Sequence, residues 1–289
     1  MKKRKMVWDM ETSDPDDFLT LLLLCGHPRV DLLAVTVTPG SRHQIGLVRR
    51  ALEWFALDIP VGAFDINHAK QCVSEWHYKA YGEIPPSEDA VVGGELLREI
   101  CSEEVILVTG AALKNLGVAM EGEFRVGRLV VQGGFAGANL VPEESQLPKF
   151  KGKITCPTFN LNGDWKSALK VLSYPGIGKR RFVSKNVCHR VLYDRELHDR
   201  VGEVKDKSLS LTLIHKGMEK YLQKRPQGKL FHDPLAACCA INPDIGKWEE
   251  VELYRERGEW GAKKRSHSGT WIIVDYVHEL FIETLLKTN

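Results

Sequence analysis

The stretch that decides the fold is MVWDMETSDPDDFLTLLLLC, Met6–Cys25. Lys5–Met10 is a short apolar run that ends in acidic residues, and Asp16–Cys25 has the pattern of a helix with carboxylates in its first turn. A β-branched run at Val30–Val37 follows, and Gln44–Ala56 has the apolar spacing of a second helix. This order predicts a strand, a polar loop and a helix at the start of an α/β fold.

Strand-like and helix-like runs continue to alternate downstream. They are Pro60–Phe64, Glu95–Glu103, Val105–Val108, Leu113–Met120 and Arg128–Val131. This alternation is typical of an open, mostly parallel, Rossmann-like sheet with helices on both faces. Phe135–Pro157 has the prolines and glycines of a long loop, and a final helix is expected near Val277–Leu286. Because no repeat or linker interrupts the pattern, we expect a single domain over residues 1–289.

Composition restricts the class of partner. The chain has 40 basic and 38 acidic residues, so its net charge of +2 predicts no nucleic-acid partner. The longest apolar stretch, Phe18–Cys25, is too short to cross a membrane. The seven cysteines are scattered without a CxxC pair, which favours reduced thiols and a cytoplasmic location.

The loop Asp9–Asp17 carries five carboxylates within nine residues. So many negative charges at the end of a buried strand repel one another unless a cation is bound. Oxygen donors of this kind suit Ca²⁺ or Mg²⁺ rather than zinc. A second acidic feature, His232-Asp233-Pro234, begins an apolar helix and by itself is also good helix-capping chemistry.

Taken together, these motifs resemble those of the inosine–uridine type nucleoside hydrolases over nearly the whole chain. The motifs that carry the resemblance are Asp9-Met10-Glu11 with Asp16-Asp17, Val108-Thr109-Gly110 before Leu113-Lys114-Asn115, Gln132-Gly133-Gly134, Thr158-Phe159-Asn160 with Asp164, and His232–Ala236. The late HDPLA motif and the paired aspartates are the more specific of these.

The resemblance implies a Ca²⁺ ion, with Mg²⁺ as the less favoured cation, in a site that binds a small-molecule riboside. Its ligands would be Glu11, Asp17, Asp233 and the backbone carbonyl of Thr109. The resemblance also implies a homodimer or homotetramer.

The same resemblance implies roles around the sugar. Asp16 and Asn160 would bind ribose hydroxyls, while water attacks the anomeric carbon through an oxocarbenium-like state. Glu11 matches the base that takes the proton from the water, and Asp14 is the alternative. His232 would assist departure of the leaving group.

Several substrate-binding positions depart from the family pattern. Ser41 stands where the family usually has Asn, Gln132 replaces Met, and Thr158 replaces a Glu that contacts the 5′-hydroxyl. His77 lies where the family has a loop histidine near the substrate. Loss of the Glu, with lysines nearby at Lys149–Lys153, makes a 5′-modified or phosphorylated riboside conceivable.

Two other functions are compatible with parts of this pattern. A haloacid dehalogenase-type, Mg²⁺-dependent phosphatase would use Asp9 as nucleophile, Glu11 as acid or base and Thr109 to bind phosphate. This alternative leaves His232 and Asp233 unexplained. A riboside-binding protein that keeps the fold and the metal without catalysis is the third possibility.

Overall fold

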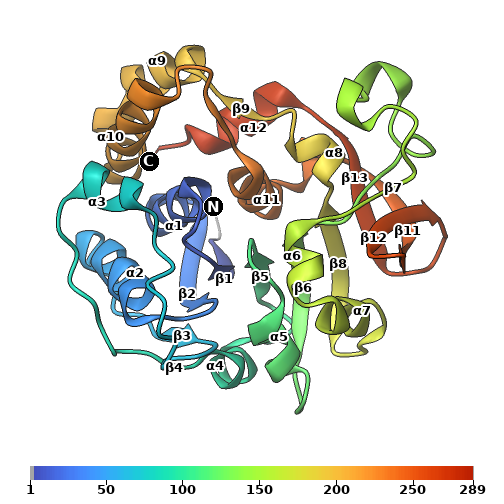
Figure 1. Ribbon diagram of the computed structural model, residues 1–289, viewed down its shortest axis with the longest axis horizontal. Helices are drawn as coiled ribbons and strands as arrows, with labels where there is room; N and C mark the ends of the chain where they lie inside the picture. Colours follow the sequence, from blue (N-terminus) through green and yellow to red (C-terminus); the bar gives the residue numbers. More distant parts are fainter. Residues whose placement is uncertain (1–2, 289) are drawn as a thin grey trace.

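The structure is a computed structural model that describes residues 3–288. Its strands are β1 (Arg4–Met10), β2 (Val30–Val37), β3 (Val61–Ala63), β4 (Val91–Val92), β5 (Ile106–Thr109), β6 (Val126–Gln132), β7 (Thr155–Cys156), β8 (Ile177–Val183), β9 (Leu192–Tyr193), β10 (Lys229–Leu230), β11 (Gly246–Glu256), β12 (Glu259–Lys264) and β13 (Thr270–Tyr276). Within residues 3–288, eleven of them form one sheet in the order β4-β3-β2-β1-β5-β6-β8-β13-β11-β12-β7 (Figure 1).

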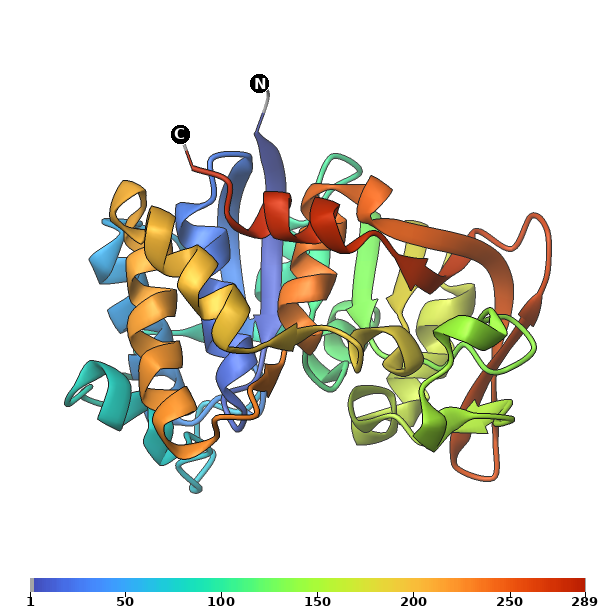
Figure 2. The ribbon, with the colours of Figure 1, turned by 90° about the horizontal axis from the view of Figure 1, so that it is seen from above.

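The sheet is parallel from β4 through β13 in that order, and β11, β12 and β7 join it antiparallel. The predicted open, mostly parallel α/β sheet is therefore confirmed. The hairpin formed by β11 and β12 lies at the end of the molecule opposite to the helix Leu209–Lys224 (Figure 2).

Helices cover both faces of the sheet. They are α1 (Pro15–Gly26), α2 (Arg42–Trp54), α3 (Glu75–Tyr81), α4 (Gly93–Ile100), α5 (Lys114–Ala119), α6 (Phe159–Gly163), α7 (Trp165–Ser173), α8 (Lys185–Cys188), α9 (Arg195–Val204), α10 (Leu209–Lys224), α11 (His232–Ile241) and α12 (His278–Leu285). Short 3₁₀ turns lie at Glu143–Ser145, Pro148–Phe150, Lys205–Lys207 and Pro243–Ile245. In the part of the chain that the structure describes, no helix has the length and hydropathy needed to cross a bilayer.

Strand β1 shows why the sheet has two cores. Its side chains alternate between faces, so Met6, Trp8 and Met10 pack in one hydrophobic core and Val7 packs in the other. Helices α1, α10 and α11 contribute to the first core, and α1 lies against both of the others. A strand buried on both faces is expected to be apolar, and the buried part of β1, Met6–Met10, is apolar except for Asp9.

The elements expected from the sequence near the N-terminus and near the C-terminal helix are present. Strand β2 has the predicted bounds, Val30–Val37, and the region 135–157 contains only two 3₁₀ turns and the two-residue strand β7. Helices α6 to α10 were not predicted. Two of them, Phe159–Gly163 and Lys185–Cys188, are too short to show a helical repeat.

The strand order also locates a crevice. Strand β1 has β2 on one side and β5 on the other, so the chain order reverses beside β1. In open α/β sheets, ligands bind outside the carboxyl ends of the strands at such a point. The acidic loop follows β1 there, and the ends of β5 and β6 lie next to it.

Candidate active site

A cavity of about 990 Å³ lies at the carboxyl ends of β1, β5 and β6. Its walls come from the acidic loop, α3, the start of α6, the end of α10 and the start of α11. The sequence-predicted site residues that line it are Glu11, Asp14, Asp16, Asp17, Gln132, Asn160, His232 and Asp233. Residues separated by more than 200 positions, such as Asp16 and Asp233, thus meet in one place.

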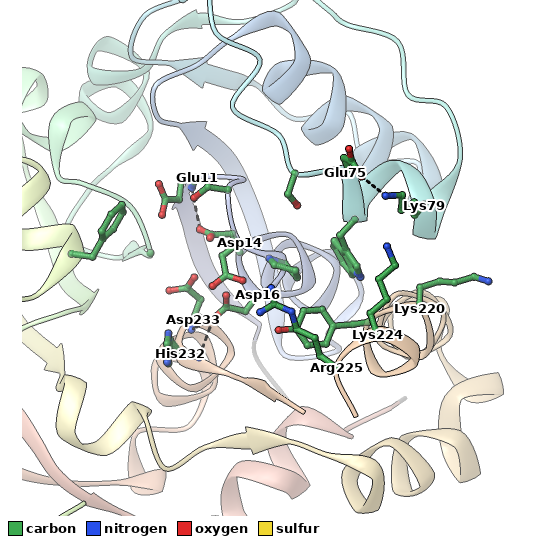
Figure 3. A pocket seen from close by; sticks show the side chains of 18 of the residues that line it. Glu11, Asp14, Asp16, Glu75, Lys79, Lys220, Lys224, Arg225, His232 and Asp233 are labelled. Atoms are coloured by element: carbon green, nitrogen blue, oxygen red, sulfur yellow. Dashed lines mark hydrogen bonds and ion pairs between the residues drawn. The ribbon is translucent and has the colours of Figure 1, made fainter. Parts of the chain in front are cut away.

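The carboxylate cluster, as we name Glu11, Asp14, Asp16, Asp17 and Asp233, forms the floor of the cavity (Figure 3). Oxygen atoms of Asp16, Asp17 and Asp233 lie within 4.8 Å of one another, and all three residues are buried. The backbone N–H of Glu11 donates to Asp17 Oδ1 at 3.0 Å, which fixes the loop against the first turn of α1.

Burial and mutual repulsion make this cluster suited to a cation. Burial, followed by the charges of Asp233 and Glu11, holds the pKa of Asp17 well above its usual range. Burial, followed by Asp16 and Glu11, does the same for Asp233. Asp233 Oδ1 is buried and, among residues 3–288, has no hydrogen-bond partner. The donor set therefore fits a hard divalent cation that accepts oxygen ligands.

Gly110 allows Asp233 to approach the end of β5. A Cβ atom at this position would lie 2.6 Å from Asp233 Oδ1 and 2.7 Å from the ring of Trp8. Thr109 itself is fully buried, and its hydroxyl donates to Asp9 Oδ2 at 2.8 Å. The backbone at Thr109-Gly110 thus borders the carboxylate cluster, while the Thr109 side chain binds Asp9, which is not part of the cluster.

Asp9 is not part of the carboxylate cluster. Its carboxylate accepts hydrogen bonds from Thr36 Oγ1 at 2.7 Å, Thr109 Oγ1 at 2.8 Å and Asn115 Nδ2 at 2.9 Å, and the residue is fully buried. A carboxylate enclosed in this way is not available as a nucleophile. The phosphatase alternative, which required that role, is therefore not favoured.

Lys229 was missed by sequence reasoning. Its side chain is only 5% exposed, and Nζ lies 3.0 Å from Asp16 Oδ1 and 3.1 Å from Asp14 Oδ2. Burial acts to lower the Lys229 pKa, but the two carboxylates outweigh burial and raise it. Lys229 is thus a fixed positive charge inside an acidic site.

Asp16 is the most strongly hydrogen-bonded member of the cluster. Besides Lys229, its Oδ2 accepts the backbone N–H groups of His232 at 3.0 Å and Asp233 at 3.3 Å. Burial would raise the pKa of Asp16, but Lys229 and these N–H groups outweigh it, so the pKa lies below its ordinary value. Asp16 therefore stays ionised, ready to accept a hydrogen bond from a ligand.

Glu11 and Asp14 are the two candidate bases. Burial, with the negative charges of Asp14 and Asp16, raises the pKa of Glu11 to about 7. Burial and Asp16 also raise the pKa of Asp14, against the opposing effect of Lys229. Asp14 forms an ion pair with Lys229, whereas Glu11 forms no ion pair within the described chain.

Asn160 and Gln132 form the wall opposite α10. Asn160 Nδ2 donates to Gly110 O at 2.8 Å and to Gln132 Oε1 at 2.8 Å. Gln132 Nε2 in turn donates to Cys188 Sγ at 3.3 Å. These bonds orient the two amide side chains that line the cavity.

His232 stacks on a second histidine. The rings of His189 and His232 are 4.6 Å apart at 30°, and Lys149 Nζ lies 2.8 Å from His189 Nδ1. Burial lowers the pKa of His232 to about 4, despite the opposing charge of Asp16. His232 is thus neutral at pH 7, and its Nε2 is buried without a hydrogen-bond partner among the described residues.

Three predicted substrate-binding residues do not line the cavity. Ser41 is buried as the N-cap of α2, and its hydroxyl donates to Gln71 O at 2.5 Å. Thr158 is buried before α6, and its hydroxyl has no partner within residues 3–288. His77 is buried in α3 with Nδ1 near Ser74 O, and burial lowers its pKa to about 4.

Basic residues reach the cavity from an unexpected direction. The lysines at Lys149–Lys153 do not line the cavity. Lys149 instead contacts His189, and Lys151 pairs with Glu143. The basic side chains that do line its rim are Lys79, Lys220, Lys224 and Arg225 (Figure 3). Nothing in the sequence pattern pointed to these residues, because α3 and α10 were not predicted as walls of the site.

Comparison with known proteins agrees with this arrangement. A family model described as inosine-uridine preferring nucleoside hydrolase matches residues 6–283. An uncharacterized protein of Aquifex aeolicus (strain VF5) is 29% identical over 282 residues, which cover 93% of this chain and 94% of the relative.

Solved structures share the fold at low sequence identity. An inosine-guanosine nucleoside hydrolase superposes with a TM-score of 0.71 at 17% identity, covering 98% of this chain and 97% of its own. The inosine-uridine preferring nucleoside hydrolase from Bacillus anthracis gives 0.69 at 14%, covering 97% of each chain. A purine-preferring ribonucleoside hydrolase from Gardnerella vaginalis gives 0.68 at 14%, covering 98% and 97%.

The match to the family model extends from the first strand to the last helix, and therefore includes both acidic motifs that build the carboxylate cluster. On this basis the chain belongs to the inosine–uridine preferring nucleoside hydrolase family, whose members are hydrolases acting on N-glycosyl bonds.

Proposed function

We propose that this protein is a calcium-dependent N-ribohydrolase that cleaves the N-glycosidic bond of a nucleoside or related riboside to free base and ribose. The observation that carries the proposal is the carboxylate cluster, with the unpaired, buried Asp233 Oδ1 at its centre among the described residues. Salvage of bases in the cytoplasm and assembly into a homodimer or homotetramer remain predictions from the sequence.

The proposed cation ligands are Glu11, Asp17, Asp233 and the backbone carbonyl of Thr109. Burial, followed by repulsion among the carboxylates, raises the pKa values of Asp17 and Asp233, and this supports the choice of ligands. When bound, a divalent cation neutralises that repulsion and acidifies water. Calcium is the proposed ion because the donors are all oxygen and their number is large.

Asp16 and Asn160 are proposed to bind the ribose hydroxyls. Asp16 is held ionised by Lys229 and by two backbone N–H groups, so it accepts hydrogen bonds from hydroxyl groups. Asn160 and Gln132 lie across the cavity with their amides already oriented. A sugar between these walls would have its orientation fixed before bond cleavage.

Glu11 is proposed as the general base. Glu11 lines the cavity and forms no ion pair among the described residues, so its carboxylate is available to accept a proton from water. In the proposed reaction the water oxygen bonds to the anomeric carbon while its proton passes to Glu11. The N-glycosidic bond breaks, and its electron pair leaves with the nucleobase, which takes up a proton from solvent water, while Glu11 returns its proton to solvent at the end of the turnover.

His232 is proposed to contact the leaving base as a neutral imidazole. Because its pKa is lowered to about 4, little of the imidazolium form exists at neutral pH. The ring therefore acts through a hydrogen bond to the departing base rather than as a strong acid.

Two chromogenic substrates test this function directly. With Ca²⁺ present, the protein should release nitrophenol from p-nitrophenyl β-D-ribofuranoside and not from p-nitrophenyl phosphate. Release from the phosphate alone would overturn the proposal. Calcium-dependent binding of ribose without release from the riboside would instead assign a riboside-binding protein.

A further inference from the structure

The basic side chains that line the cavity are Lys79, Lys220, Lys224 and Arg225, which we name the basic rim (Figure 3). The three lysines lie on the side of α3 and α10, together with Glu75, whereas Arg225 lies beside the carboxylate cluster, near Asp16. Three of the four come from the last turns of α10 and the residue after it, and Lys79 comes from α3. The basic rim is therefore built from two helices that are distant in sequence.

Most of the basic rim lacks a carboxylate partner. Lys79 pairs with Glu75 on its own helix. In the described part of the chain, Lys220, Lys224 and Arg225 form no ion pair, and all three are exposed. Arg225 lies 5.8 Å from the Tyr221 ring centre, and Tyr221 also lines the cavity. Arg225 helps to lower the pKa of Asp14, and Lys224 does the same for Glu75, but neither forms an ion pair among the described residues.

Close packing holds the basic rim in place. Trp76 Nε1 of α3 donates to Gly217 O of α10 at 3.1 Å, and Tyr81 OH donates to Leu213 O at 3.0 Å. A Cβ at Gly217 would lie 2.2 Å from Tyr81 Oη, so glycine permits this contact. Because α3 and α10 are fixed against each other, Lys79 and Lys220 stay on the same wall.

We propose that the basic rim binds an anionic group, phosphate or carboxylate, carried by the riboside substrate. This inference rests on the proposed function and names the substrate class. A neutral nucleoside offers these cations no charge to pair with. An anionic group would be repelled by the carboxylate cluster and attracted by the basic rim, which would orient the substrate with its sugar toward the floor.

A structural role of the lysines is the competing explanation. Cations near the C-terminus of a helix interact favourably with the helix dipole. That effect accounts for Lys224 at the end of α10, but it does not place Lys220 and Arg225 on the wall of a cavity. The two explanations differ in substrate preference, because only the proposed subsite distinguishes charged from neutral ligands.

Three matched pyrimidine ribosides test the proposal. Uridine is neutral, uridine 5′-monophosphate carries its anion on the sugar, and orotidine carries a carboxylate on the base. Their dissociation constants are measured by calorimetry with Ca²⁺ present, and ribose or ribose phosphate release is measured in parallel. The variant Lys220→Gln/Lys224→Gln/Arg225→Gln removes the unpaired cations. Lys216→Gln, on the same helix but outside the cavity lining, is the matched control.

We expect one anionic riboside to bind at least about tenfold more tightly than uridine, and the triple variant to abolish that preference. Uridine affinity should change less than about twofold, and Lys216→Gln should behave like the wild type. The identity of the preferred ligand then shows whether the anion lies on the sugar or on the base. Rising salt should weaken the same preference.

Several results would overturn the subsite. One is equal affinity for neutral and charged ribosides, and another is failure of all three ribosides to bind. A third is an anion preference that the triple variant retains, which would mean that the anion binds elsewhere, for example phosphate on the bound Ca²⁺. The single variant Lys220→Gln, expected to show a smaller loss, checks that the triple variant has not misfolded. If the rim-dependent preference is present but no ligand is cleaved, only the proposed hydrolase function fails.

Discussion

Lys229 Nζ lies 3.0 Å from Asp16 Oδ1, and both side chains are at most 5% exposed. This ion pair places a permanent positive charge inside the carboxylate cluster. It keeps Asp16 ionised and engages Asp14, so the remaining unpaired acids are Glu11, Asp17 and Asp233 within the described residues. One site can therefore hold five carboxylates, because two of them are paired with a cation of the protein itself.

Replacing Lys229 with methionine should destabilise the fold by about 3 kcal/mol, because the Asp16 carboxylate would remain buried without its cation. The measurement is urea unfolding in the presence of a chelator. Lys5→Met removes an exposed ion pair to Glu104 and should leave the unfolding free energy nearly unchanged. Equal stability of Lys229→Met and the wild type would show that the buried pair is not needed.

The Glu11→Gln substitution should lower kcat about 10²- to 10⁴-fold, because the amide cannot accept the proton from water. Steady-state kinetics at saturating Ca²⁺ provide the measurement. Glu83→Gln, an exposed substitution outside the cavity lining, is the control and should retain full activity. A larger loss in Asp14→Asn than in Glu11→Gln would assign the base to Asp14 instead.

Calcium should stabilise the wild type by about 2.7 kcal/mol at a concentration one hundred times its Kd. The Asp17→Asn substitution should remove most of this gain, because it takes away one charge from the proposed ligand set. Scanning calorimetry with and without Ca²⁺ measures the difference. Asp31→Asn, at an exposed position on β2, should keep the full shift. An undiminished shift in Asp17→Asn would rule that residue out as a ligand.

Buried His77 should make the protein sensitive to acid. Burial lowers its pKa to about 4 from an ordinary 6.5, so the unfolded chain binds more protons between these values. The stability that His77 contributes is complete above pH 6.5 and is lost as the pH falls toward 4. His77→Gln should flatten this part of the stability profile, whereas His278→Gln, at an exposed position, should not. Parallel profiles for His77→Gln and the wild type would contradict this assignment.

The fold was predictable where local sequence determines it. A buried parallel strand such as Val30–Val37 needs apolar residues on both faces, and that requirement is visible without coordinates. The carboxylate cluster was predictable because its loop follows a strand directly. Asp9 was grouped with that loop, but the structure pairs it with Thr36, Thr109 and Asn115.

The features that the sequence did not reveal depend on contacts between distant segments. Lys229 meets Asp16 only because α1 and α11 begin side by side at the carboxyl ends of the central strands. The basic rim depends on how α10 packs against α3, which helical periodicity does not specify. Ser41 matches a family position in sequence, yet in this chain its hydroxyl caps α2 and contacts Gln71.

The most direct test of the central claim is ribose release from a panel of purine and pyrimidine nucleosides before and after chelation. The account predicts release in Ca²⁺, loss of release in EDTA, recovery when excess Ca²⁺ is restored, and none from Asp17→Asn. Release that persists in EDTA, or no release from any nucleoside or 5′-nucleotide in Ca²⁺, would contradict the account.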